Sequence, residues 1–174
     1  MKKVLSMLVV LFSVTTLFAQ TSLPINEKTQ KICFQKVINT VGSQDEVYNR
    51  IYGVFMNDYY KNPSNVIQSN DGRVIKGKHH FQLDNGDPVQ SKWPWVIYRF
   101  VIEVREGRVR YTITDFMQKT QSNHPVEEWL DKEATGYQPI WDNYLEQIAA
   151  FGEDWGAKFE ESLVPEQVIE EEEW

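Results

Sequence analysis

The sequence contains a single cysteine, Cys33, among its 174 residues. One cysteine cannot form an intramolecular disulfide, so the fold has to be held by its apolar core. A reactive thiol is typically found at a helix N-terminus or in a basic pocket, and the segment Lys31–Phe34 does not have the pattern of such a site. We therefore interpret Cys33 as a small apolar residue buried on a strand, with an intermolecular disulfide as the alternative.

Histidine is equally scarce, with His79, His80 and His124 as the three examples. Adjacent residues on a strand point to opposite faces, so we expect His79 to face the core and His80 to face solvent, without a shared metal. No zinc-ligand spacing is present. The segment Asp84–Asp87 lacks the ligand spacing and closing glutamate of a calcium loop and is interpreted as a turn. We expect no metal and no cofactor.

Known catalytic motifs are missing as well. The sequence has no G-x-S-x-G elbow, no G-x-G-x-x-G segment and no P-loop. Glu127 and Asp131 lie one helical turn apart, but glycosidase carboxylate pairs usually come from separate elements that face a cleft. We interpret them as part of a solvated helix face. No catalytic residues are predicted, and an enzyme, such as an envelope hydrolase, is the least favoured function.

Basic residues are outnumbered, with 18 Lys and Arg against 25 Asp and Glu, which gives a net charge of −7 and a pI near 5.0. Nucleic-acid binding relies on clustered basic residues that neutralise phosphates, so we expect no nucleic-acid partner. Hydrophobic residues make up 41% of the chain and aromatic residues 13%, which is too apolar for a disordered protein. The length corresponds to one domain.

Long apolar runs are confined to the N-terminus. Lys2 and Lys3 precede the apolar segment 4–18, and Ala19 is a small residue at the expected cleavage point. This pattern predicts a secretory signal peptide over residues 1–19. Its removal leaves 16 basic and 25 acidic residues, a net charge of −9. We expect an exported protein, periplasmic or secreted, with no transmembrane segment after cleavage.

The first half of the exported chain predicts a polar leader over 20–30, a strand near 32–38 and a helix over 44–61. The helix is introduced by a capping box in which Ser43 and Glu46 satisfy each other's backbone N–H groups. A hairpin turn at 70–72 then leads into a strand over 73–83, in a register that sets Ile67 opposite Ile75.

The pattern of residues 95–116 predicts a second hairpin with a two-residue turn at Glu106-Gly107. This register places every large apolar side chain on one face and pairs Glu103 with Arg110 on the other. The predicted pairs of the apolar face are Val104 with Val109, Ile102 with Tyr111 and Phe100 with Ile113.

The remainder predicts a polar linker over 117–137 with a short helical candidate at 126–133, a helix over 139–162, and an acidic tail over 164–174. Gly152 and Gly156 either break the last helix or let it approach the sheet closely. The tail is expected not to pack, so truncation after Phe159 is predicted to leave stability nearly unchanged. Together residues 31–163 are predicted to form an α+β, two-layer domain with a single antiparallel sheet and two main helices packed on one face, in the order β-α-β(4 or more)-α.

One set of segments carries structural motifs: Leu23–Asn26, Ile32, Phe34, Val37, Gly42-Ser43, Glu46–Tyr48, Ile75–Lys78 and Arg110–Phe116. Together these segments resemble an exported bacterial family of unknown function with a TATA-box-binding-protein-like (TBP-like) fold. The resemblance covers roughly residues 23–116. It implies the fold and brings no catalytic residues, and it does not imply DNA binding, because fold alone does not carry function.

Trp93 and Trp95 flank Pro94 directly before the second hairpin and are the candidate partner-binding residues. They either cap the end of the core or form an aromatic platform for an envelope protein, peptide or glycan. The favoured function is therefore an exported binding or interaction module. A carrier that holds a small apolar ligand between sheet and helices is the alternative.

Overall fold

The computed structural model describes residues 23–165 of the chain. The predicted signal peptide (1–19) and most of the predicted tail (164–174) lie outside these residues. The elements along the chain are β1 (Phe34–Asn39), α1 (Gln44–Arg50), η1 (Ile51–Met56, a π-helix), α2 (Asn57–Tyr59), η2 (Pro63–Asn65), β2 (Ile67–Asn70), β3 (Val74–Gln82), η3 (Gln90–Lys92), β4 (Trp95–Arg105), β5 (Arg108–Gln118), β6 (His124–Pro125), η4 (Val126–Leu130) and α3 (Ile140–Ser162).

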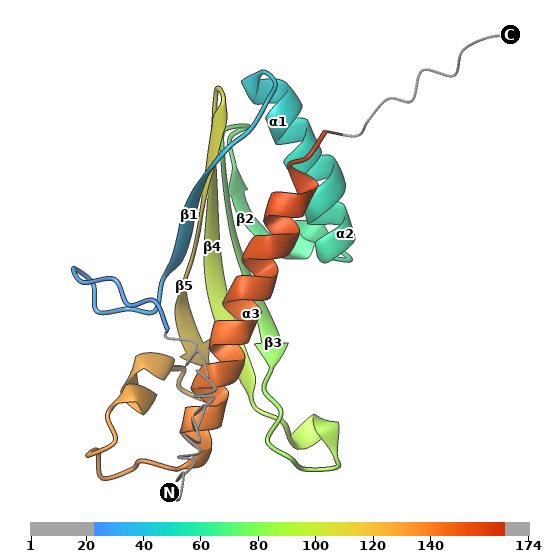
Figure 1. The fold of residues 1–174 in the computed structure, drawn as a ribbon. Coiled ribbons are helices and arrows are strands. Elements are labelled where there is room, and N and C mark those ends of the chain that lie inside the picture. The colour runs from blue at the N-terminus through green and yellow to red at the C-terminus, as the bar shows by residue number, and fades with distance from the viewer. Residues whose placement is uncertain (1–22, 166–174) are drawn as a thin grey trace, which may run out of the picture.

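One antiparallel sheet forms the framework, in the order β1-β5-β4-β3-β2, and the short β6 pairs with β5. The helices α1, α2 and α3 all lie on the same face of this sheet (Figure 1). The predicted α+β two-layer architecture is confirmed. Within residues 23–165, no helix combines the length and apolar character that a membrane span requires.

The central hairpin has the predicted register. Val104 is opposite Val109, Ile102 is opposite Tyr111, and Phe100 is opposite Ile113. The β2–β3 register differs from the prediction, because Asn70 rather than Ile67 is opposite Ile75 and a bulge shifts the pairing. The turn motif predicts the position of this hairpin correctly. Its register was not predictable, because β2 has too few apolar residues to favour one pairing over another.

The helical layer begins at the predicted capping box. The Ser43 side chain accepts the Glu46 N–H, and the Glu46 carboxylate accepts the Ser43 N–H at 2.7 Å. The predicted single helix over 44–61 is divided, since its middle, η1, is a π-helix. This wider turn buries Ile51 and Met56 together, both without exposed surface.

Aromatic rings fill the space between the sheet and the helices. Phe100 stacks on Tyr60 with ring centroids 5.5 Å apart, and Trp155 of α3 lies 5.9 Å from the Phe100 ring. Trp141, near the start of α3, instead stacks on Trp129 of η4 with ring centroids 5.9 Å apart, so the α3 ring at Phe100 is that of Trp155.

Two glycines in α3 let the helix approach the sheet. A Cβ atom at Gly152 would lie 2.5 Å from the Phe34 ring, and one at Gly156 would lie 2.4 Å from the Tyr111 hydroxyl. The helix is continuous through both positions. The close-approach alternative is therefore the correct one.

The stretch 117–137, predicted as a polar linker within the domain with a short helical candidate at 126–133, contains secondary structure and buried side chains. β5 continues to Gln118, β6 pairs with it, and η4 follows. Val126 and Trp129 of η4 are buried. The polar composition of this stretch does not indicate that it packs on the domain, because the burial of two apolar residues is enough to anchor a short 3-10 helix.

Candidate binding surface

The face of the sheet away from the helices carries most of its charge in basic side chains. Residues of β3, β4 and β5 alternate between buried positions and positions on this open face. Six basic side chains occupy the open-face positions, against two acidic ones, although the whole chain is acidic. The basic residues are Lys76, Lys78, Arg99, Arg105, Arg108 and Arg110, and the acidic residues are Glu103 and Asp115.

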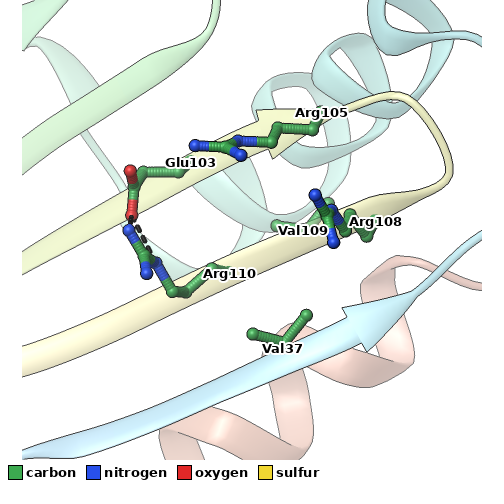
Figure 2. Close-up of a pocket in the computed structure, with 6 residues that line it drawn as sticks. All are labelled: Val37, Glu103, Arg105, Arg108, Val109 and Arg110. Atoms are coloured by element: carbon green, nitrogen blue, oxygen red, sulfur yellow. Dashed lines mark hydrogen bonds and ion pairs between the residues drawn. The ribbon is translucent and has the colours of Figure 1, made fainter.

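Three arginines gather at the β4–β5 turn, around a hollow of about 170 Å³ (Figure 2). Arg110 forms an ion pair with Glu103, the cross-strand pair expected from the register. Arg105 and Arg108 are opposite each other and exposed, and neither forms an ion pair within residues 23–165. Val37 of β1 completes the rim with 57% of its surface exposed. We call the site formed by Val37, Glu103, Arg105, Arg108 and Arg110 the arginine hollow.

A bulge shapes the middle of the open face. The pairing of β4 with β5 shifts between Ile97 and Arg99, and Asp115 adopts a positive φ of 55° there. The extra residue sends Phe116 into the core while Asp115 stays on the open face, where it pairs with Lys31 and with Arg99 at 3.7 Å. One acidic group therefore balances two basic ones at this point.

The opposite end of the open face is aromatic. Trp95 lies against His80 with ring centroids 4.8 Å apart. Burial, followed by the nearby charge of Lys119, lowers the pKa of His80, so the ring is neutral at pH 7. His79 lies on the core side as expected, with its ring 5.1 Å from that of Tyr60, but it also stacks on His80 at 4.9 Å, so the two rings are closer together than expected.

The two candidate tryptophans do not form one platform. Trp93 is half-buried, and its indole N–H donates to the Asp87 carbonyl at 2.8 Å, which ties down the loop before β4. Trp95 begins β4 and belongs to the open face. Both tryptophans are half-buried, and of the two Trp95 is the one on the open face, whereas Trp93 has a structural contact.

The remaining candidate groups lie in structural contacts. Glu127 accepts the Ile32 N–H at 2.9 Å and so joins η4 to the start of β1, instead of lying on a solvated helix face. Cys33 is half-buried, just before β1, and burial, together with the charge of Asp115, raises the pKa of its thiol. In residues 23–165 no group of three or more His, Cys, Asp or Glu side chains is placed to hold a metal ion.

The signal for this surface was present in the sequence. Basic residues occupy every second position in Lys76–Lys78 and again in Arg108–Arg110. A net charge of −7 conceals this segregation, because most acidic residues lie on other elements: α3 alone carries six acidic side chains and one basic one. Charge has to be counted for each face rather than for the chain.

The fold is shared with solved bacterial proteins. A TBP-like protein from Parabacteroides distasonis matches with a TM-score of 0.64 at 13% identity, over 81% of this chain and 96% of its own length. A DUF4468 family protein from Bacteroides ovatus matches with a TM-score of 0.61 at 15% identity, over 86% of this chain and 94% of its own. The chain has a TBP-like fold.

The TBP-like fold confirms the resemblance stated from the sequence segments, at the level of architecture. No protein-family model matches the sequence, and the search of curated proteins finds no match. At such low identity the TBP-like neighbours say nothing about chemistry, so functional inference has to come from the surface itself.

Proposed function

We propose that the protein is an exported, non-catalytic interaction module of the bacterial envelope, and that its partner is a protein docking on the open sheet face. The observation that carries the proposal is the basic open face on an acidic chain. Complementary potentials steer association and select partners, so a face of this sign favours an acidic protein surface.

The composition of the face supports a protein partner. Basic side chains at the arginine hollow are joined by apolar surface at Val37, Val101 and Trp95, of which Trp95 lies at the far end. Protein interfaces combine aromatic anchors and arginine in this way. A glycan platform would need coplanar exposed rings, and Trp93 is instead held by the Asp87 carbonyl.

The alternative of an apolar-ligand carrier has less support from the packing. Tyr60, Phe100 and Trp155 contact one another where a ligand between sheet and helices would have to lie. A groove lined by Val54, Tyr59 and Lys158 between η1 and α3 is open to solvent rather than enclosed. Carrier sites are usually pre-formed cavities that enclose most of the ligand.

Site-specific photocrosslinking in the cells that make the protein tests the docking face. A photoreactive residue at Val101, in the middle of the open face, is expected to give a discrete protein adduct. The matched control is the same residue at Glu153, on the exposed side of α3. The adduct should also be lost in the charge-reversed variant Arg105→Glu/Arg108→Glu. Adducts from Glu153 alone would contradict the proposed face.

The export proposal has its own measurement. Mass spectrometry of the protein recovered from the envelope fraction should find an N-terminus near Gln20. Retention of Met1 would contradict export and with it the choice of an envelope partner.

A further inference from the structure

We propose that the arginine hollow is a binding site for an acidic peptide segment, and that its occupant is the chain's own C-terminal segment Glu166–Trp174, docking within the same molecule. This inference does not rest on the proposed function, because it concerns a contact inside one chain. It identifies a ligand of stated chemistry for a site in which Arg105 and Arg108 form no ion pair among residues 23–165.

Charge complementarity is the first argument. Glu166–Trp174 contains five glutamates and no basic residue. The hollow presents Arg105 and Arg108 exposed and without an ion pair in the described part of the chain. Guanidinium groups bind carboxylates through two parallel hydrogen bonds, which makes an arginine pair a suitable receptor for a run of glutamates.

The place where the described chain ends is the second argument. Pro165 lies beside Val41, since the two line the same surface hollows. One residue earlier, the Thr40 N–H donates to the carbonyl of Gly107, the turn residue between Arg105 and Arg108. The C-terminal segment therefore starts at the end of the sheet that carries the arginine hollow.

The length of the segment is sufficient. Nine extended residues span roughly 30 Å at about 3.3 Å each. From the edge strand β1, the strands β5 and β4 are one and two spacings away, or about 10 Å in total. The remaining length allows the chain to pass around the edge of the sheet from the helical face to the open face.

The apolar residues of the segment also match the hollow. Val168 and Ile169 precede the glutamates, and Trp174 follows them. Val37 is an exposed apolar residue on the rim of the hollow. The guanidinium groups of the arginines can form cation–π contacts with the indole of Trp174. A docked segment would cover part of the proposed partner face, so an acidic partner would have to displace it.

A zero-length crosslink tests the contact in the full chain. In the variant Arg105→Lys/Arg108→Lys, the charge is kept and amines are introduced that carbodiimide can join to carboxylates. We expect peptide mapping to find amide links between these positions and Glu170–Glu173, and expect 1 M NaCl to suppress them because charge is screened over about 3 Å. Native Lys61 and Lys158, which lie outside the open face, are the internal controls.

Three outcomes would overturn the inference. The first is the absence of any link from the glutamates to positions 105 and 108. The second is a set of links dominated by Lys61 or Lys158. The third, in a mixture of isotope-labelled and unlabelled protein, is links that join the two populations, which would assign the occupant to a second copy.

A competition measurement provides an independent readout with conservative variants. A fluorescent peptide with the sequence of residues 165–174 is titrated against the wild-type chain and against the full-length variant with Glu170–Glu173 changed to Gln. We expect the variant to bind the peptide at least several-fold more tightly, because its own segment no longer competes, and expect Arg105→Glu/Arg108→Glu in that background to abolish binding. Equal binding by wild type and variant would overturn the inference. The photocrosslinking above reports other molecules, so the two proposals fail separately.

Discussion

The indole N–H of Trp155 donates a 2.8 Å hydrogen bond to the Tyr60 hydroxyl, which lies 3.0 Å from the hydroxyl of Tyr98. These three residues come from α3, the end of the first helical segment and β4. The contact is buried, so it joins both main helices and the sheet at one polar point inside an aromatic core. Buried polar groups of this kind are costly when a partner is removed.

Tyr98→Phe is therefore expected to destabilise the protein by about 1–2 kcal/mol, since the Tyr60 hydroxyl loses a buried partner. Urea unfolding measures the change. Tyr52→Phe is the matched control, because Tyr52 stacks on Tyr48 at the half-buried side of the helix and contributes no hydroxyl to this network. Equal effects of the two variants would show that the network adds little.

Alkaline pH should weaken the fold through the same residues. Burial raises the pKa of Tyr60 and Tyr98 far above the ordinary tyrosine value of about 10. Above roughly pH 10 the unfolded chain loses these protons while the folded chain keeps them, so the free energy of unfolding falls as pH rises. Below that pH the two residues have no effect on the pH dependence. Unfolding curves from pH 8 to 11 should show the fall, with a shallower slope in Tyr98→Phe.

Phe100→Ala should cost about 3–5 kcal/mol, because it removes a ring that contacts Tyr60 and Trp155 in a core without a disulfide. Arg99→Ala, one residue away on the open face, should cost less than about 1 kcal/mol. Arg99 is exposed and its ion pair with Asp115 measures 3.7 Å. If urea unfolding shows that the two variants lose similar amounts of unfolding free energy, the strand is buried on both faces and the open face is not exposed to solvent.

Gly77→Ala tests the close packing under Phe100. A Cβ atom at Gly77 would lie 2.1 Å from Cζ of the Phe100 ring, so the ring has to move. Overpacking of this kind typically costs about 1–3 kcal/mol. Gly53→Ala is the control, since a Cβ there meets nothing within 4 Å. The double variant Gly77→Ala/Phe100→Leu should recover part of the loss, and additive costs would contradict a direct clash.

Truncation separates the domain from its C-terminal segment. The sequence suggested that a cut after Phe159 would be harmless, but Leu163 is only 3% exposed and its carbonyl accepts a hydrogen bond from Arg50. We now expect a cut after Phe159 to lower the melting temperature by several degrees, and a cut after Pro165 to lower it by less, because it removes the contact of the C-terminal segment alone. Thermal unfolding of both truncated chains decides the point.

The parts of the fold that sequence predicted best are those with dense, periodic patterns. Five alternating apolar residues in β4 and three in β5 allow a single register, and the Ser43–Glu46 capping box marks a helix start by hydrogen-bonding chemistry alone. The register of β2 was missed because Ile67 is its one large apolar residue. Local pattern cannot choose between registers when so little apolar area depends on the choice.

The candidate site was predicted less well for a different reason. Trp95 was singled out because paired tryptophans are conspicuous, but Trp93 has its contact with the Asp87 carbonyl, which sequence cannot show. The arginine hollow depends on Arg105 and Arg108 meeting across a turn and on Val37 arriving from a strand far away in the chain. The net charge of the chain adds these basic residues to the acidic residues of the helices, so it gave no indication of a basic face.

The position of β1 in the sheet has a consequence for how the protein folds. β1 is made first, yet it pairs only with β5, the last long strand to be made. Its backbone groups therefore stay without their partners until most of the domain has been synthesised, while β4 and β5 can pair at once through their short turn. Local contacts form before distant ones, so β1 is the last long strand to join. Substitutions at the β1–β5 contact, such as Phe34→Leu, should then speed unfolding more than they slow folding.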